Sequence, residues 1–125
     1  DRSVSRGLGD VYKRQDLLFH DALSQNMIGR LEEISEDVNP LLSTVFYDIQ
    51  DYHASPIEAA QAANEANVKE LIFYHLTPAP QNFIAKIIFV RGVNEVRPDN
   101  WTLADDGTMA ILPIESEDIT ITNIQ

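Results

Sequence analysis

Three histidines and one aspartate are the residues of this sequence whose types and positions could do chemistry. His20 and Asp21 follow a short apolar run, His53 precedes a segment with helix-start residues, and His75 ends a second apolar run. An imidazole can bind a metal ion or transfer a proton near neutral pH, and a carboxylate can orient it. We take His53 and His75 as the main candidates for catalysis or metal binding, with His20 and Asp21 as supporting or substrate-side candidates.

Each candidate also has a structural interpretation. A histidine at a strand end can be a satisfied polar residue, and His53 could simply bond the backbone at a helix entry. Ser55 lies in no Gly-x-Ser-x-Gly elbow, so a serine nucleophile is not expected. The acidic run from Glu32 to Asp37 lacks the spacing of a calcium loop and is interpreted as a solvated helix end. The histidines therefore stay the main candidates.

Two predicted strands must position these side chains. The apolar run Leu17 to Phe19 predicts a buried strand that delivers His20 and Asp21 at its end, and Leu71 to Tyr74 predicts another that ends at His75. Open α/β sheets commonly build sites along the rim where parallel strands end. We therefore expect the histidines to meet at one rim.

Helices are predicted between and after these strands. The clearest signal is local: Ser55 suits an N-cap, Pro56 the first helical position, Glu58 a capping box, and Asn67 a left-handed end. Two further helices are expected before it, and one after the second strand. Their expected inward residues are Ala22, Met27, Ile28, Leu31 and Ile34; Leu41, Leu42, Val45, Phe46 and Ile49 in a helix opened by Pro40; and Phe83, Ile84, Ile87 and Ile88.

The end of the chain predicts β structure. Two apolar-rich runs flank Asp106-Gly107, which predicts a hairpin turned at that dipeptide. The tail from 114 to 125 alternates weakly and could be an edge strand or a loose end. Together the elements predict an α/β layered architecture.

The first fifteen residues stand apart from the rest. The stretch from Ser5 to Gln15 matches one reading frame of an oligonucleotide adapter used in sequencing libraries, and it has no apolar period. We interpret residues 1–15 as not native and expect native sequence, lacking its own start, from Asp16. Gly9-Asp10 is then a chance imitation of a functional motif.

Charge and composition limit the function classes. The chain has nine basic and twenty acidic residues. Residues 1–15 hold four of the basic and two of the acidic residues, so residues 16–125 carry a net charge of −13. Nucleic acid is therefore an unexpected partner for this segment. Cysteine is absent, which excludes disulfides and thiolate metal sites, and no apolar run is long enough to predict a membrane span.

Three stretches resemble a known family. The stretch LLFHDAL is similar to the His-Glu-Ala element of metallo-β-lactamase-fold hydrolases of the ribonuclease Z and arylsulfatase-like branch, with Asp21 in place of glutamate. YHASPIEAAQAA resembles the family's His-Ser-Thr stretch, with alanine in place of serine, and LIFYHLTP resembles its last metal-binding motif. With the stretch from 89 to 113, the resemblance covers nearly all of residues 16–113.

The resemblance implies the C-terminal half of an αββα sandwich and a binuclear site, most often zinc, that hydrolyses phosphate, sulfate or carboxylic esters. It implies that His75 is a metal ligand and that His53 contacts the substrate. The family's other ligand motifs precede such a segment and do not occur here, so at most a partial site is expected. We expect residues 16–125 to be an inactive fragment of an active metal-dependent hydrolase.

Other expectations follow from the same interpretation. Half a sandwich would expose a sheet face, which favours poor solubility or a homo-oligomer. The compartment, cytoplasmic or periplasmic, is not indicated. The alternative function is a non-enzymatic acidic α/β interaction domain that binds a basic partner, with structural histidines.

Overall fold

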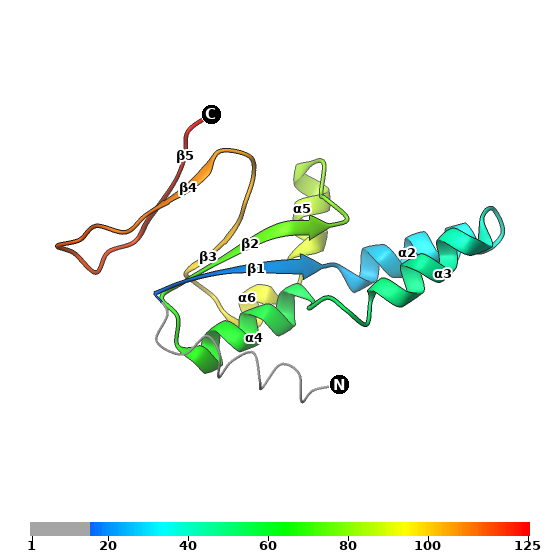
Figure 1. Cartoon of the computed structure of the whole chain (residues 1–125), viewed down its shortest axis with the longest axis horizontal. Helices are drawn as coiled ribbons and strands as arrows, with labels where there is room; N and C mark the ends of the chain where they lie inside the picture. The colour runs from blue at the N-terminus through cyan, green and yellow to red at the C-terminus, as the bar shows by residue number, and fades with distance from the viewer. Residues whose placement is uncertain (1–15) are drawn as a thin grey trace.

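A computed structural model describes residues 16–125, which form a mixed α/β fold (Figure 1). A parallel sheet has the strand order β1-β2-β3, and β4 pairs with β5 in a separate antiparallel ribbon. The strands are β1 (Leu17–Leu23), β2 (Glu70–Thr77), β3 (Trp101–Leu103), β4 (Thr108–Ile111) and β5 (Thr120–Asn123). The helices are α2 (Gln25–Glu36), α3 (Pro40–Ile49), α4 (Pro56–Ala66), α5 (Phe83–Phe89) and α6 (Val93–Val96). The α/β prediction is thereby confirmed.

Helix α4 covers the parallel sheet and forms the core with it. Its alanines are buried, and they pack with apolar residues of β1 and β2. Because alanine has no side chain beyond Cβ, the helix can lie close to the strands. The members of this cluster are Leu18, Ala22, Ala59, Ala60, Ala63, Ala66, Val68, Leu71, Phe73, Phe89 and Val93.

The predicted ends of α4 are confirmed in detail. Ser55 Oγ accepts a hydrogen bond from the Glu58 amide at 3.2 Å, and Glu58 Oε2 accepts one from the Ser55 amide at 2.8 Å. This reciprocal pair satisfies two amides that the first helical turn leaves unpaired. Pro56 opens the helix and Asn67 closes it in the left-handed conformation, with φ +56°. The capping box therefore fixes where the loop that carries His53 enters the helix.

Arg97 ties α4 to the segments that lead into β2 and β3. Only 8% of this residue is exposed, and its guanidinium donates four hydrogen bonds. The acceptors are Asn64 Oδ1 on α4 at 2.9 Å, the carbonyls of Val68 and Lys69 at 3.0 and 3.2 Å, and the Asn100 carbonyl at 3.1 Å. A buried cation is tolerated here because every bond goes to a fixed oxygen.

Both long strands extend further than predicted. β1 runs through Leu23, so His20, Asp21 and Ala22 lie within it, and Ala22 is not helical. β2 runs through Thr77, so His75 is also inside a strand. The two strands stay paired beyond their apolar centres, so the polar residues that follow these centres also lie within the strands.

Helices α2 and α3 form a helical hairpin that projects from the body of the fold (Figure 1). Their predicted existence is confirmed, but both predicted buried faces are wrong in part. In α2, Leu31 and Ile34 are exposed, the latter by 67%; in α3, Leu41 is 76% exposed, and Leu42 and Val45 are also exposed. The buried residue of α3 is instead Ser43. Each helix of the hairpin packs mainly against the other, so only a narrow stripe of each is covered.

Two expectations for the second half of the chain are wrong. The predicted inward residues of α5, from Phe83 to Ile88, are exposed, and Phe89 is its buried residue. Trp101 to Leu103 do not form a hairpin with the residues after Gly107 but pair in parallel with β2. β4 pairs with β5, so the tail is a ribbon strand rather than a loose end. The prediction of a turn at Gly107 is correct, because this glycine has a φ of +86°.

Among residues 16–125, no helix combines the length and apolar character that crossing a membrane requires.

Candidate functional site

The end of β1 and the loop before α4 bring Asp21 and His53 into contact. The Leu23 amide donates to the Ala54 carbonyl at 2.9 Å, which fixes this loop against the end of β1. Asp21 Oδ2 lies 2.8 Å from His53 Nδ1, and both side chains are about one third exposed. The predicted rim therefore does bring these two residues together.

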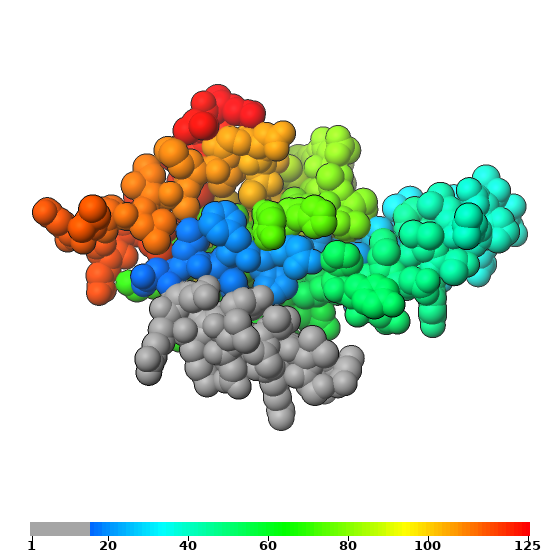
Figure 2. Space-filling view, viewed as in Figure 1, coloured from blue at the N-terminus to red at the C-terminus, as the bar shows by residue number. Residues whose placement is uncertain are grey.

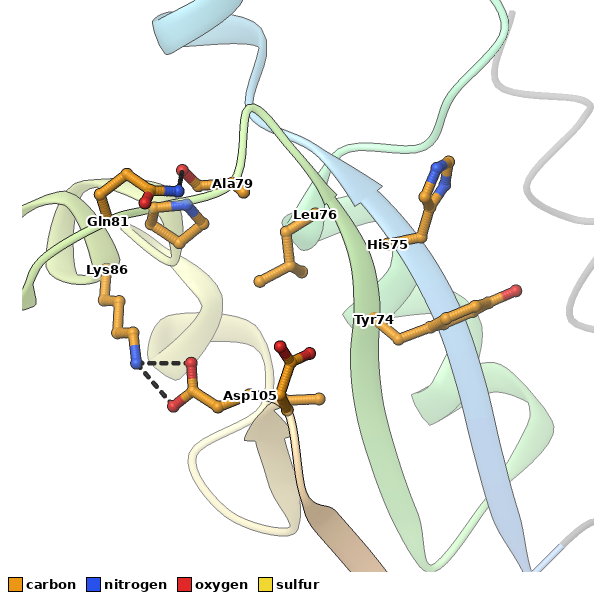
Figure 3. A pocket seen from close by; sticks show the side chains of 10 residues that line it. Tyr74, His75, Leu76, Ala79, Gln81, Lys86 and Asp105 are labelled. Atoms are coloured by element: carbon orange, nitrogen blue, oxygen red, sulfur yellow. Dashed lines mark hydrogen bonds and ion pairs between the residues drawn. The ribbon is translucent and has the colours of Figure 1, made fainter. Parts of the chain in front are cut away.

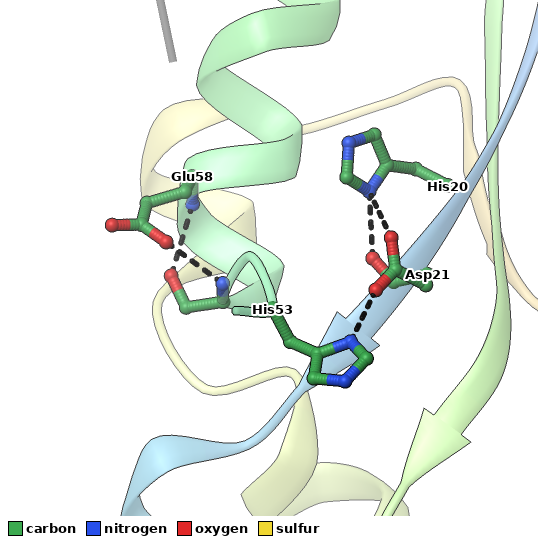
Figure 4. A network of polar contacts seen from close by, with 5 residues as sticks. His20, Asp21, His53 and Glu58 are labelled. Carbon is green, nitrogen blue, oxygen red and sulfur yellow. Dashed lines mark hydrogen bonds and ion pairs between the residues drawn. The ribbon is translucent and has the colours of Figure 1, made fainter. Parts of the chain in front are cut away.

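Asp21 also lies beside His20, as Figure 4 shows. His20 Nδ1 is 2.7 Å from the Asp21 carbonyl oxygen and 3.3 Å from Asp21 Oδ1, and only 6% of His20 is exposed. Both of these oxygens are acceptors, so Nδ1 of His20 carries the proton. The carboxylate of Asp21 thus lies between two imidazoles, of which His20 is the more buried.

The same argument assigns the tautomer of His53. Its Nδ1 faces a carboxylate oxygen, so this nitrogen donates its proton to Asp21. In the neutral ring Nε2 then carries a lone pair, and no hydrogen bond to Nε2 occurs among residues 16–125. A histidine held in this way can accept a proton at Nε2 and return it, with the aspartate stabilising the charged ring.

His75 occupies an irregular position in β2. The register of β1 and β2 shifts there: Asp21 pairs with Tyr74 and Ala22 with Leu76, which leaves His75 as an extra residue. Its φ is +47°, a left-handed conformation that costs a residue with Cβ about 1–2 kcal/mol. Bulges of this kind redirect a side chain and are frequent beside active sites.

The bulge places His75 beside His53. The two ring centroids are 6.4 Å apart, and the rings are tilted by 56°. All four candidate residues therefore lie at one end of the β1–β2 pair, as predicted. Their arrangement does not by itself complete a metal site: no three His, Cys, Asp or Glu side chains within 16–125 are placed to hold an ion.

A cleft of about 590 Å³ lies between the end of β2, helix α5 and the loop that follows β3. The last backbone bond on the β3 side of β2 runs from the Ala104 amide to the Phe73 carbonyl at 2.9 Å, so the next residues of β2 have no strand beside them. Figure 3 shows Leu76 extending into the cleft, whereas His75 extends on the opposite side of the strand. His75 is nevertheless among the residues that line the cleft, and His53 is not.

The sequence interpretation missed the charged pair that lines this cleft. Lys86 Nζ lies 2.8 and 2.6 Å from the two oxygens of Asp105. Nineteen positions separate the two residues, and no local pattern connects α5 with the loop after β3. Only the fold could have revealed the pair.

Comparison with known proteins adds no assignment: no protein-family model matches this chain, and no curated protein matches its sequence.

Proposed function

We propose that residues 16–125 belong to a metal-dependent hydrolase of the metallo-β-lactamase fold that acts on phosphate, sulfate or carboxylic esters. The observation that carries the proposal is the 2.8 Å contact between Asp21 and His53, with the His75 ring 6.4 Å from His53. A carboxylate, an oriented imidazole and a second histidine on a strained backbone make a constellation suited to general acid–base catalysis.

His53 is the proposed catalytic residue. With Nδ1 donating to Asp21, its Nε2 would face the substrate, accept the proton that the attacking water loses, and deliver it to the leaving oxygen. Asp21 would hold the ring in this tautomer and stabilise its charged form. His20, which bonds the Asp21 carbonyl, would fix the position of that carboxylate and is a positioning residue.

His75 is the proposed metal ligand of this segment. Zinc in the complete protein would supply an activated hydroxide as nucleophile. The described donors do not complete such a centre, so the remaining ligands would belong to sequence outside residues 16–125. On this proposal the 125-residue chain alone binds no pair of metal ions tightly and turns over no ester.

The test is made on the complete protein of which this chain would be a part. We expect chelator-sensitive hydrolysis of at least one phosphate, sulfate or carboxylic ester of p-nitrophenol, and His75→Ala should abolish both turnover and stoichiometric zinc. The control variant is Tyr52→Ala, because Tyr52 precedes His53 in the same loop and is 81% exposed. Unchanged zinc content and turnover in His75→Ala would refute the assignment.

The same experiment separates the alternative function, an acidic interaction domain. That alternative rests on the net charge of −13 for residues 16–125. It predicts no tight binding of two zinc equivalents by the complete protein and no hydrolysis of any of the three ester classes.

A further inference from the structure

Strand β2 continues past its neighbour β3, which leaves one edge of its last residues without a strand beside it. β2 has eight residues and β3 only three, and the last paired residues are Phe73 and Leu103. The other edge of β2 stays covered, because β1 pairs with it as far as Thr77. An uncovered strand edge presents backbone groups that another extended chain can bind.

The bulge in β2 turns the backbone of Leu76 toward this uncovered edge. Before the bulge, the Phe73 carbonyl faces the β3 side, where it accepts a 2.9 Å hydrogen bond from the Ala104 amide. After the bulge, the Thr77 carbonyl faces the β1 side and accepts a 2.9 Å hydrogen bond from the Ser24 amide. Because successive residues of a strand face opposite edges, the amide and the carbonyl of Leu76 face the uncovered edge.

A fixed turn directs the chain away from this edge after β3. The Asp105 amide donates to Thr108 Oγ1, and the Thr108 amide donates to the Asp105 carbonyl, each at 3.0 Å. The Asp105 carboxylate is held by Lys86 Nζ at 2.8 and 2.6 Å. These contacts engage both the backbone and the side chain of Asp105, so β3 ends before it reaches Leu76. The cleft is the space that this turn leaves open, which Figure 3 shows between Leu76 and the Lys86–Asp105 pair.

The cleft combines an apolar lining with an excess of negative charge. Its volume of about 590 Å³ lies within the range of roughly 300–1,000 Å³ that is usual for binding sites. Lys86 and Asp105 neutralise each other, whereas no hydrogen bond or ion pair engages the Asp106 carboxylate within the described part of the chain. Residues 16–125 carry a net charge of −13, so the potential favours a cationic group over an anionic one. The apolar residues of the lining are Leu76, Ala79, Pro80 and Ala104.

We propose that this cleft binds an extended peptide segment that carries a lysine or arginine, and that the segment pairs with Leu76 as an added strand. Its backbone donates to the Leu76 carbonyl and accepts from the Leu76 amide, along the line that β3 leaves. Its basic side chain pairs with Asp106. Figure 2 shows the end of β2 at the surface, with helix α5 and the segment after β3 next to it. The inference does not depend on the proposed hydrolase, because Asp21 and His53 do not line the cleft.

The test uses short blocked peptides and the 125-residue chain. The probe is acetyl-Val-Lys-Val-amide, and the matched control is acetyl-Val-Glu-Val-amide, each titrated to about 10 mM in about 0.1 M salt and followed by ¹H–¹⁵N correlation spectra. We expect a dissociation constant of about 1 mM for the lysine peptide, with a shift of the Leu76 amide signal. The glutamate peptide should bind at least about tenfold more weakly.

A pair of protein variants tests the contribution of charge. Asp106→Asn should weaken binding of the lysine peptide by about threefold to fivefold, and the Asn-Gly dipeptide that it creates still suits the turn. Asp99→Asn is the control, because Asp99 is also exposed but lies before β3 rather than after it. Binding to this control variant should stay within about 1.5-fold of that to the unchanged chain.

A pair of modified peptides tests the backbone contact without altering the protein. Only alternate amides of an added strand face the neighbouring strand. Methylating the nitrogen of one of two successive peptide amides should therefore abolish binding, and methylating the other should leave it. Four results would overturn the proposal: no binding of the lysine peptide, equal binding of the two probes, equal effects of Asp106→Asn and Asp99→Asn, or equal effects of the two methylations.

Discussion

Replacing Arg97 with methionine should destabilise the protein strongly. Methionine keeps most of the length and apolar volume of the side chain but donates no hydrogen bond. The change removes one donor from each of four oxygens, including the carbonyls of Val68 and Lys69 just before β2, while the Asn100 carbonyl keeps its bond from the Leu71 amide. Because backbone carbonyls stay behind when the side chain is removed, the cost includes their desolvation.

The contacts of Arg97 set the size of the effect. The bond to the Val68 carbonyl is buried, and those to Lys69, Asn64 and Asn100 are partly buried. One buried bond from a charged donor contributes about 1.5–3 kcal/mol, and partly solvated bonds contribute about 0.5 kcal/mol each. Burial lowers the pKa of Arg97, with the Glu70 charge acting in the opposite direction, so removing the buried cation recovers part of the loss. We expect a net loss of about 3 kcal/mol from the free energy of unfolding.

Urea denaturation followed by circular dichroism measures this loss. For a chain of this size the midpoint should fall by about 2 M. The matched control is Arg91→Met, because Arg91 is exposed and its side chain makes no hydrogen bond among the described residues; its midpoint should stay within about 0.4 M. An unchanged or higher midpoint for Arg97→Met would refute the reasoning, since it would mean that burying the guanidinium costs as much as its bonds return.

Three further changes test local features of the fold by urea denaturation. Ser55→Ala removes the oxygen that caps α4 and should lower the free energy of unfolding by about 1 kcal/mol; no loss would contradict the capping role. His75→Gly should be more stable than His75→Ala by about 1 kcal/mol, because alanine keeps the left-handed strain that glycine lacks; equal stability would argue against strain. Burial raises the pKa of Glu70 above 4.5, opposed by the Arg97 charge. A raised carboxyl pKa favours folding at pH below 4.5, and that contribution is lost as the pH rises through the folded-state pKa. Glu70→Gln should reduce this loss, and an unaltered pH dependence would contradict it.

The parts of the fold that the sequence predicts well are those set by neighbouring residues. Ser55, Glu58 and Asn67 determine the ends of α4 through bonds within a few positions, and all three act as expected. Similarly, Gly107 marks a turn because its positive φ is a local requirement. Such features depend little on the rest of the chain.

The errors concern partners that are distant in sequence. An apolar stripe indicates that a helix has a face to bury but not whether a neighbour exists, and Leu41 and Ile84 remain exposed. Likewise, the sequence around Trp101 indicates a strand but not that β2 is its partner. Long-range pairing depends on the whole topology, which no local window contains.

The candidate site lies between these two cases. The strand-end pattern correctly predicts that His53 and His75 approach each other. It does not predict the hydrogen bond between Asp21 and His53, which are 32 positions apart, or the bulge that leaves His75 in a left-handed conformation. Both depend on the register of β1 against β2.

The most direct test of the proposed site is the effect of Asp21→Asn on kcat in the complete protein. An amide can offer its NH₂ group to His53 Nδ1 and so favours the wrong tautomer, while it preserves the size of the side chain. If Asp21 orients His53 for proton transfer, kcat should fall by about 10²–10⁴-fold, with zinc content and the midpoint of unfolding little changed. An unchanged kcat in a folded, zinc-loaded variant would contradict the catalytic role of the Asp21–His53 pair.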